Sequence, residues 1–180
     1  MPEKLDFITP TFLKAFDVFH EDTMREMHER EVVKKARISK GSANLILRKL
    51  ANLGILERER RGRMVFYRIN LKNPVAKQLK ILFNVYSLHE LVNKLKPYCK
   101  KIVLFGSCAE GTDVRESDID LFVLTADKDE VKKKISGYRK KLSRRLAPIL
   151  VEIDELVTLK KEDKPLYDRI SRGIALWESK

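Results

Sequence analysis

Residues 106–120 read GSCAEGTDVRESDID, and they separate two apolar runs at 102–105 and 121–124. Asp118 and Asp120 stand two positions apart, at the point where the second run begins. Carboxylates are poor strand formers and costly to bury, so their presence at the start of a strand calls for a compensating partner. We interpret that partner as a metal ion.

The spacing of the two aspartates fits this interpretation. On a strand, Asp118 and Asp120 point to the same face, about 6.6 Å apart, while Ile119 and Leu121 point the other way into a core. Carboxylate oxygens placed in this way suit one or two hard divalent cations, with Mg2+ or Mn2+ as the expected ion.

The run at 102–105 is typical of a buried strand that ends in a Gly-Ser turn. Gly106 has no side chain, so the backbone can approach a ligand closely there. Ser107 can offer its hydroxyl and its backbone N–H to a phosphate, and small Ala109 and Gly111 keep the turn tight. A turn that holds phosphate, beside a pair of carboxylates, indicates a site for phosphoryl or nucleotidyl transfer.

This stretch resembles the signature of the DNA polymerase β-type nucleotidyltransferase superfamily, and specifically the minimal nucleotidyltransferases. The matching positions are Gly106, Ser107, Ala109, Gly111, Ser117, Asp118 and Asp120. Glu110 stands where a basic residue is common, and the resemblance extends from about Lys100 to the C-terminus. It implies catalytic and metal-binding roles for Asp118 and Asp120, and nucleotide binding by Gly106, Ser107 and Ser117.

The activity implied by the resemblance is transfer of a nucleoside monophosphate, with AMP the expected group, from a nucleoside triphosphate and Mg2+ to an acceptor hydroxyl. The resemblance also implies a toxin–antitoxin setting, with a small helical HEPN-type protein as partner. The rival interpretation is a transcription regulator whose nucleotidyltransferase-like domain senses a nucleotide or has lost its activity.

The third carboxylate that the family carries is expected within PILVEIDELVTL, residues 148–159. If this segment continues as a strand, Glu152 and Asp154 share one face, and Asp154 is the candidate third ligand or base. If the strand ends early and a helix begins near residue 153, Asp154 is an N-cap and the third acid is missing. In that second reading the fold persists while catalysis weakens or vanishes.

The first third of the chain predicts three short helices and a hairpin. Helical patterns cover residues 11–20, 27–36 and 38–54, and strand patterns cover residues 55–69. Ser39 is the expected N-cap of the third helix, and Gly54 is its expected stop. Arg61 and Gly62 are the expected hairpin turn, in which the glycine supplies a positive φ.

The face of the third helix opposite its apolar stripe carries small and basic side chains, of the types that contact phosphates and base edges. The hairpin tip adds arginines. The candidate DNA-binding residues are Lys40, Ser42, Asn44, Arg48, Arg60, Arg61 and Arg63. Residues 31–70 resemble the winged helix-turn-helix domains of prokaryotic, expected archaeal, transcription regulators, although Arg37 stands where many members have glycine.

The winged-helix resemblance implies double-stranded DNA as a partner. A formal net charge of +12 also favours a polyanionic partner. Three alternatives stay open, namely a protein-interaction module, a solvated charged edge strand, and a thermophile surface rich in Lys and Glu. We read Cys99 and Cys108 as ordinary thiols, and with no membrane span or signal-peptide pattern we expect a cytoplasmic protein.

These patterns together predict a mixed α/β (α+β) protein. We expect a winged helix-turn-helix domain over residues 1–72, a helical linker over 73–98, and a mixed-sheet nucleotidyltransferase domain over 99–180. An apolar stripe along the linker indicates packing surface or a homodimer contact.

Overall fold

The computed structural model describes residues 7–179 of the chain. By its contacts the chain divides into two compact units, Met1–Leu79 and Lys80–Lys180. Over the described residues, no helix combines the length and the apolar character that crossing a membrane requires. The predicted mixed α/β class is confirmed, whereas the domain boundaries at 72 and 98 stay predictions.

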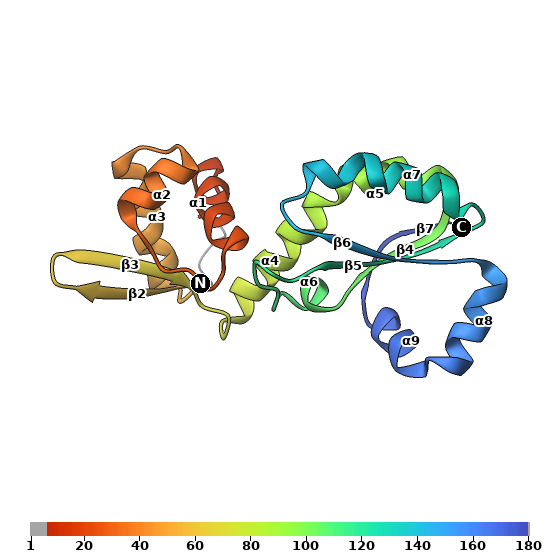
Figure 1. The fold of residues 1–180 in the computed structure, drawn as a ribbon. Helices are drawn as coiled ribbons and strands as arrows, with labels where there is room; N and C mark the ends of the chain where they lie inside the picture. Colours follow the sequence, from red (N-terminus) through yellow and green to blue (C-terminus); the bar gives the residue numbers. More distant parts are fainter. Residues whose placement is uncertain (1–6, 180) are drawn as a thin grey trace. The chain divides into compact units, whose positions relative to one another are not determined.

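Over residues 7–69 the N-terminal unit consists of three helices and a three-stranded antiparallel sheet (Figure 1). Its elements are α1 (Pro10–Glu21), β1 (Met27–His28), α2 (Glu29–Ala36), α3 (Lys40–Asn52), β2 (Leu56–Arg61) and β3 (Met64–Ile69). Phe12, Phe16 and Phe19 of α1 are fully buried, as expected for apolar side chains at helical spacing. They contribute to this unit's core.

Side-chain caps set where α2 and α3 begin. The His28 imidazole accepts from the Arg30 N–H, while the Glu31 carboxylate accepts from the His28 N–H, so α2 starts at Glu29, two residues later than the sequence pattern predicts. The predicted cap of α3 is present, because Ser39 Oγ accepts from the Ser42 N–H at 3.1 Å. Between these helices Arg37 has a left-handed φ of 52°, a conformation that glycine adopts more easily.

The hairpin turns where the sequence predicts. Arg61 and Met64 are paired across the β2–β3 register, and Gly62 between them has a φ of +61°. Tyr67 and Ile69 of β3 are buried, so one face of the hairpin packs on the helices. Most of the β2 side chains are exposed.

The C-terminal unit is built on a mixed four-stranded sheet of order β6-β5-β4-β7. The strands are β4 (Cys99–Phe105), β5 (Ile119–Thr125), β6 (Leu146–Val151) and β7 (Ile174–Glu178). Strands β4 and β5 are antiparallel, as are β4 and β7, whereas β5 and β6 are parallel. The edge strand β6 contains Pro148, and edge strands are where a sheet tolerates proline.

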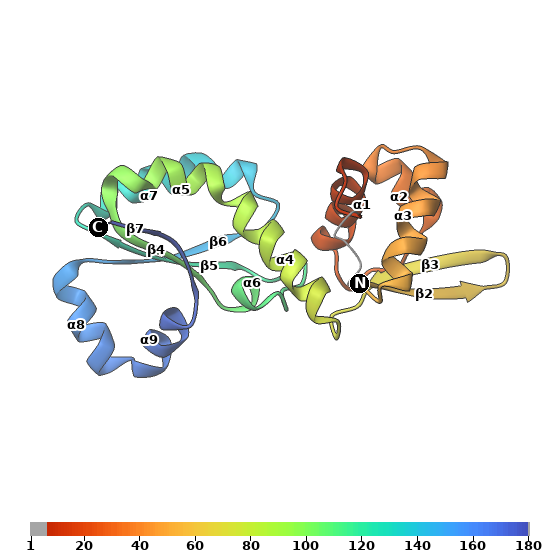
Figure 2. The ribbon, with the colours of Figure 1, turned by 180° about the vertical axis from the view of Figure 1, so that it is seen from behind.

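Helices cover both faces of this sheet (Figures 1 and 2). They are α5 (His89–Leu95), α6 (Ser107–Glu110), α7 (Lys128–Tyr138), α8 (Ile153–Glu162) and α9 (Lys164–Ser171), with single 3-10 turns at Lys96–Tyr98 and Arg139–Lys141. The side of α5 and α7 holds the larger core cluster, which includes Leu104 and Leu121. The side of α8 and α9 holds a smaller cluster around Val103 and Phe122.

The linker pattern forms a broken pair of helices, α4 (Pro74–Ser87) followed by α5. Asn73 caps α4, since its Oδ1 accepts from the Val75 N–H at 2.8 Å. Val75 and Leu82 are 46% and 53% exposed, so part of the apolar stripe is not buried within the chain. A homodimer contact through this stripe stays a prediction.

Candidate active site

The Gly-Ser turn follows β4 directly. Gly106 has a φ of 68°, and Gly111, which caps the end of the one-turn helix α6, has the same φ. A side chain at position 106 would overlap Asp120 Oδ2, so only glycine lets the turn pass this close to the carboxylate. The turn is closed by the Thr112 N–H, which donates to the Ser107 carbonyl at 3.1 Å.

The two aspartates occupy the start of β5. Asp118 immediately precedes the strand and Asp120 lies within it, with side chains 40% and 31% exposed. Ile119 and Leu121 between and beyond them are buried on the other face, as the alternation predicts.

Two arginines approach these carboxylates. Arg145 Nη1 lies 3.8 Å from Asp118 Oδ2, and Arg169 Nη2 lies 3.9 Å from Asp120 Oδ2. Both distances exceed hydrogen-bond length, so the carboxylate oxygens keep their capacity to accept. Partial burial raises the pKa of Asp120, Arg169 opposes that rise, and Asp118 adds to it. A bound cation would lower the pKa of Asp120 and so oppose the effects of burial and of Asp118.

Asp154, the third predicted catalytic residue, does not lie beside Asp118 and Asp120. Strand β6 ends at Val151, and Glu152, not Asp154, is the N-cap of α8. The Glu155 carboxylate accepts from the Glu152 N–H at 2.8 Å, which completes a capping box and ends the strand. This is the second of the two registers left open by the sequence.

The parallel register of β5 and β6 shows why Asp154 is remote. Asp120 is level with Ala147, whereas Val151 is level with Leu124, four residues further along β5. Asp154 follows Val151, so it lies beyond the opposite end of the strand pair from Asp120, about 13 Å or more away along the strands. Among residues 7–179, no His, Cys, Asp or Glu makes this pair into a group of three that could hold a metal.

Ser117 immediately precedes Asp118, and it forms hydrogen bonds within its own loop. Its hydroxyl accepts from the Val114 N–H at 3.0 Å, and its N–H donates to the Val114 carbonyl at 3.0 Å. These bonds close the turn that leads into Asp118. The structure therefore brings together Gly106, Ser107, Asp118 and Asp120, with Ser117 supporting them.

A buried polar cluster beneath this loop was not predicted from the sequence. Asp113 Oδ2 lies 2.6 Å from Arg144 Nη1 and 3.2 Å from Lys80 Nζ, and Asn84 Nδ2 donates to Asp113 Oδ1 at 3.0 Å. Asn84 also donates to the Cys108 carbonyl at 2.9 Å, so the cluster holds both α6 and the loop after it. The signal in the sequence was weak, namely a lysine and an asparagine on the otherwise apolar side of a helix.

The candidate DNA-binding residues of α3 divide into two kinds. Lys40 and Arg48 are exposed, whereas Ser42 and Asn44 bond within the protein. Asn44 Nδ2 donates to Glu29 Oε2 at 2.8 Å, and Ser42 Oγ accepts from Ser39 Oγ at 2.8 Å. Leu45, which the sequence pattern did not indicate as a candidate, is 76% exposed on the same helix.

The hairpin arginines also divide into residues that bond within the protein and one that is exposed at the turn. Arg61 Nη1 lies 2.7 Å from Glu26 Oε2, and its Nη2 lies 2.6 Å from Glu59 Oε2. Arg60 Nε donates to the Gly62 carbonyl at 3.1 Å, while Arg63 is exposed at the turn. The charge of Arg61 is therefore largely neutralised by its neighbours.

Residues 86–172 match the model of the family described as "Nucleotidyltransferase domain". This range contains the Gly-Ser turn, both aspartates and the strands that carry them. The chain therefore contains a nucleotidyltransferase domain. None of the curated proteins compared with this chain matches it.

Solved structures that resemble the chain include two toxin–antitoxin crystal structures. One, of a mutant MntA–HpeT, has 23% identity and a TM-score of 0.38, over 53% of this chain and 74% of that chain. The other, with AMP-PNP, has 27% identity and a TM-score of 0.38, over 54% and 75% of the two chains. A protein from Sulfolobus solfataricus assigned as a nucleotidyltransferase has 16% identity and a TM-score of 0.39, over 61% and 93%.

Proposed function

We propose that the Lys80–Lys180 unit binds a nucleoside triphosphate with Mg2+ or Mn2+ and transfers a nucleoside monophosphate, with AMP the expected group, to an acceptor hydroxyl. The observation that carries the proposal is the contact of Asp120 with Gly106, where a carboxylate lies against a turn that has no side chain. A metal ligand and a turn suited to phosphate thus meet at one point.

Asp118 and Asp120 are the residues that would hold the metal ion. Mg2+ in phosphate-transfer sites is usually bound by one or two carboxylates, with water and substrate phosphates completing its coordination, so this donor set fits. When bound, the ion would neutralise charge on the triphosphate.

The chain's own residues have further roles in the proposal. The Ser107 hydroxyl and N–H would hold phosphate oxygens, and Gly106 would let them approach. Arg145 and Arg169 bring positive charge to the same place, which favours a polyanionic substrate. Ser117 keeps Asp118 at the start of β5 by closing the preceding loop.

Calorimetric titration with a non-hydrolysable ATP analogue, with and without Mg2+, tests the site. We expect metal-dependent binding by the wild type and loss of that binding in an Asp118→Asn/Asp120→Asn double variant. Asp129→Asn, an exposed position on α7, is the matched control and should bind like the wild type. Absence of binding by folded wild-type protein would contradict the proposal.

A second candidate function is a regulator that senses the nucleotide without transferring it. The observation that favours it is Ala147, a residue without a carboxylate, level with Asp120 on β6. An Ala147→Asp variant would place a third acid beside Asp120. Transfer from labelled ATP to hydroxyl acceptors by this variant, but not by the wild type, would support the sensor, and transfer by the wild type would rule it out.

We further propose that the N-terminal unit binds double-stranded DNA as a winged helix. Exposed Lys40 and Arg48 on α3 support this, together with the net charge of +12. Replacing both by alanine should lower affinity for DNA and reduce the slope of log K against log salt by about 2. Lys132→Ala, which removes a charge from α7, is the control, and an unchanged slope in the double variant would contradict the proposed face.

A HEPN-type protein partner, implied by the family resemblance, stays a prediction. Co-purification of the full chain with such a helical protein expressed beside it is the direct measurement.

A further inference from the structure

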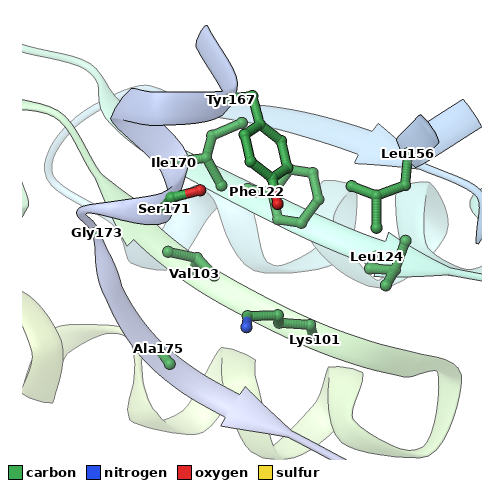
Figure 3. A pocket seen from close by; sticks show the side chains of 10 residues that line it. All are labelled: Lys101, Val103, Phe122, Leu124, Leu156, Tyr167, Ile170, Ser171, Gly173 and Ala175. Carbon is green, nitrogen blue, oxygen red and sulfur yellow. The ribbon is translucent and has the colours of Figure 1, made fainter. Parts of the chain in front are cut away.

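A pocket of about 160 Å³ lies between the sheet of the C-terminal unit and helices α8 and α9 (Figure 3). The strands β4 and β5 supply its floor, and the two helices cover it. Its lining residues are Lys101, Val103, Phe122, Leu124, Leu156, Tyr167, Ile170, Ser171, Gly173 and Ala175. The proposed function gives this pocket no role.

The pocket and the metal site share one face of the sheet. Because side chains alternate along a strand, Asp120, Phe122 and Leu124 of β5 point to the same side. Phe122 is two residues beyond Asp120, which is about 7 Å along the strand. A ribose bridges a gap of that order between a phosphate and a base.

Helix α9 contributes residues both to the surroundings of Asp120 and to the pocket. Arg169 lies 3.9 Å from Asp120 Oδ2 and 5.7 Å from the centre of the Phe105 ring, while the next residue, Ile170, lines the pocket. Gly173, just after the helix, has no room for a Cβ, which would meet the Leu104 carbonyl oxygen at 2.5 Å. The end of α9 is therefore held close to β4, beside the row of side chains that leads to Asp120.

The lining suits a flat ring with a polar edge. Phe122 and Tyr167 provide aromatic surface, and Figure 3 shows the Tyr167 ring extending from α9 over the strands. The Ser171 hydroxyl lines the same space, as does Lys101, whose ammonium donates to Glu178 Oε1 at 3.0 Å and has further N–H groups to donate. The volume is well below the roughly 300–1,000 Å³ of pockets that enclose drug-sized ligands, so it has room for one ring system and not for a whole nucleotide.

We propose that this pocket receives the base of the nucleotide whose phosphates lie at Asp118 and Asp120. The inference rests on the proposed function of the carboxylate site, and it adds the place and chemistry of base recognition. Tyr167 and Phe122 hold the ring by apolar and stacking contacts, and Ser171 and Lys101 bond to its edge.

The test compares two probes in the full chain, a non-hydrolysable ATP analogue and inorganic triphosphate, each titrated with Mg2+ by calorimetry. Ser171→Trp and Ala175→Trp each add a large ring at the lining of the pocket, and both positions are exposed enough to accept a larger residue. Arg172→Trp adds the same ring next to the pocket and is the matched control. We expect the filling variants to lose at least tenfold in affinity for the analogue while binding triphosphate within twofold of the wild type.

The other outcomes separate the two proposals. Filling variants that bind the analogue like the wild type overturn the base pocket, as does an equal loss for both probes. Wild-type protein that binds neither probe overturns the proposed function and this inference with it. Wild-type protein that binds the analogue no more tightly than triphosphate leaves the metal site standing and overturns the base pocket alone.

Discussion

Two lysine–aspartate pairs in the C-terminal unit have the same separation and opposite surroundings. Lys80 Nζ lies 3.2 Å from Asp113 Oδ2, and Lys132 Nζ lies 3.2 Å from Asp129 Oδ1. The first two side chains are 0% and 1% exposed, and the second two are 62% and 93% exposed. Exposed pairs contribute about 0–1 kcal/mol, whereas breaking a buried pair typically costs about 3–5 kcal/mol. The environment of a pair, more than its geometry, decides what it does for the protein.

The buried pair belongs to a cluster in which one carboxylate serves two cations. Burial alone would raise the pKa of Asp113, but Lys80 and Arg144 outweigh that effect and hold its pKa below the ordinary value. Burial lowers the pKa of Lys80 against the attraction of Asp113. The cluster is thus stable as a unit and vulnerable to the loss of its single acid.

Asp113→Asn should give the largest loss of stability. It leaves Lys80 and Arg144 near each other without a carboxylate, and we expect a loss of about 3–5 kcal/mol in the free energy of unfolding, measured by urea denaturation. Asp129→Asn makes the same chemical change at the exposed pair and should leave the midpoint unchanged. Equal losses in the two variants would contradict the role of burial.

Asn84→Ala should give the next largest effect. It removes the bonds to the Cys108 carbonyl and Asp113, and it leaves Arg144 without the Asn84 carbonyl oxygen at 2.6 Å. We expect a loss of about 2 kcal/mol in unfolding free energy. Because these bonds hold the turn and the loop before Asp118, affinity for the ATP analogue should also fall. Unchanged nucleotide affinity would show that the buried cluster does not support the nucleotide site.

The contribution of Asp113 to the stability of the fold should decrease as the pH is lowered. Its pKa is lowered in the folded state, so its stabilisation is fully present above the unfolded value of about 3.9 and is lost as pH falls through the lower folded pKa. The stability difference between wild type and Asp113→Asn should therefore be constant from pH 7 to about pH 5 and shrink below pH 4. Chemical denaturation over this range measures it, and a difference that grows on acidification would contradict the assignment.

Glu59→Gln should give the smallest effect on stability, with no measurable change in the unfolding midpoint. The pair with Arg61 is exposed, and Arg61 keeps Glu26 as a partner. Because the change removes an acid from the hairpin, affinity for DNA should rise by about twofold at low salt. A fall in DNA affinity would show that Glu59 positions Arg61 for binding.

The elements predicted well from the sequence are those specified by neighbouring residues. The Gly106–Ser107 turn and the strand at Asp120 follow from local spacing, as does the start of α3 at its Ser39 cap. Asp154 was ambiguous because two local patterns competed there, a capping box that begins at Glu152 and a continued strand. A Glu-x-x-Glu signal was present there, and it would have favoured the helix.

The buried cluster was beyond prediction for a physical reason. Asp113 lies 33 residues from Lys80 and 31 from Arg144, and each is an ordinary polar residue in its own segment. Such long-range pairing leaves little local pattern beyond a lysine and an asparagine on the apolar side of one helix. The same holds for Ala147, whose position beside Asp120 depends on the register of two strands that are far apart in sequence.

Pro148 in the edge strand β6 has a consequence for how copies of the chain behave when crowded. An open strand edge offers a row of donors and acceptors to any other extended chain, and proline removes one donor from the strand. A foreign strand that tried to extend the sheet past β6 would meet an incomplete ladder. A residue that has no N–H to donate thus lowers the tendency of the protein to aggregate.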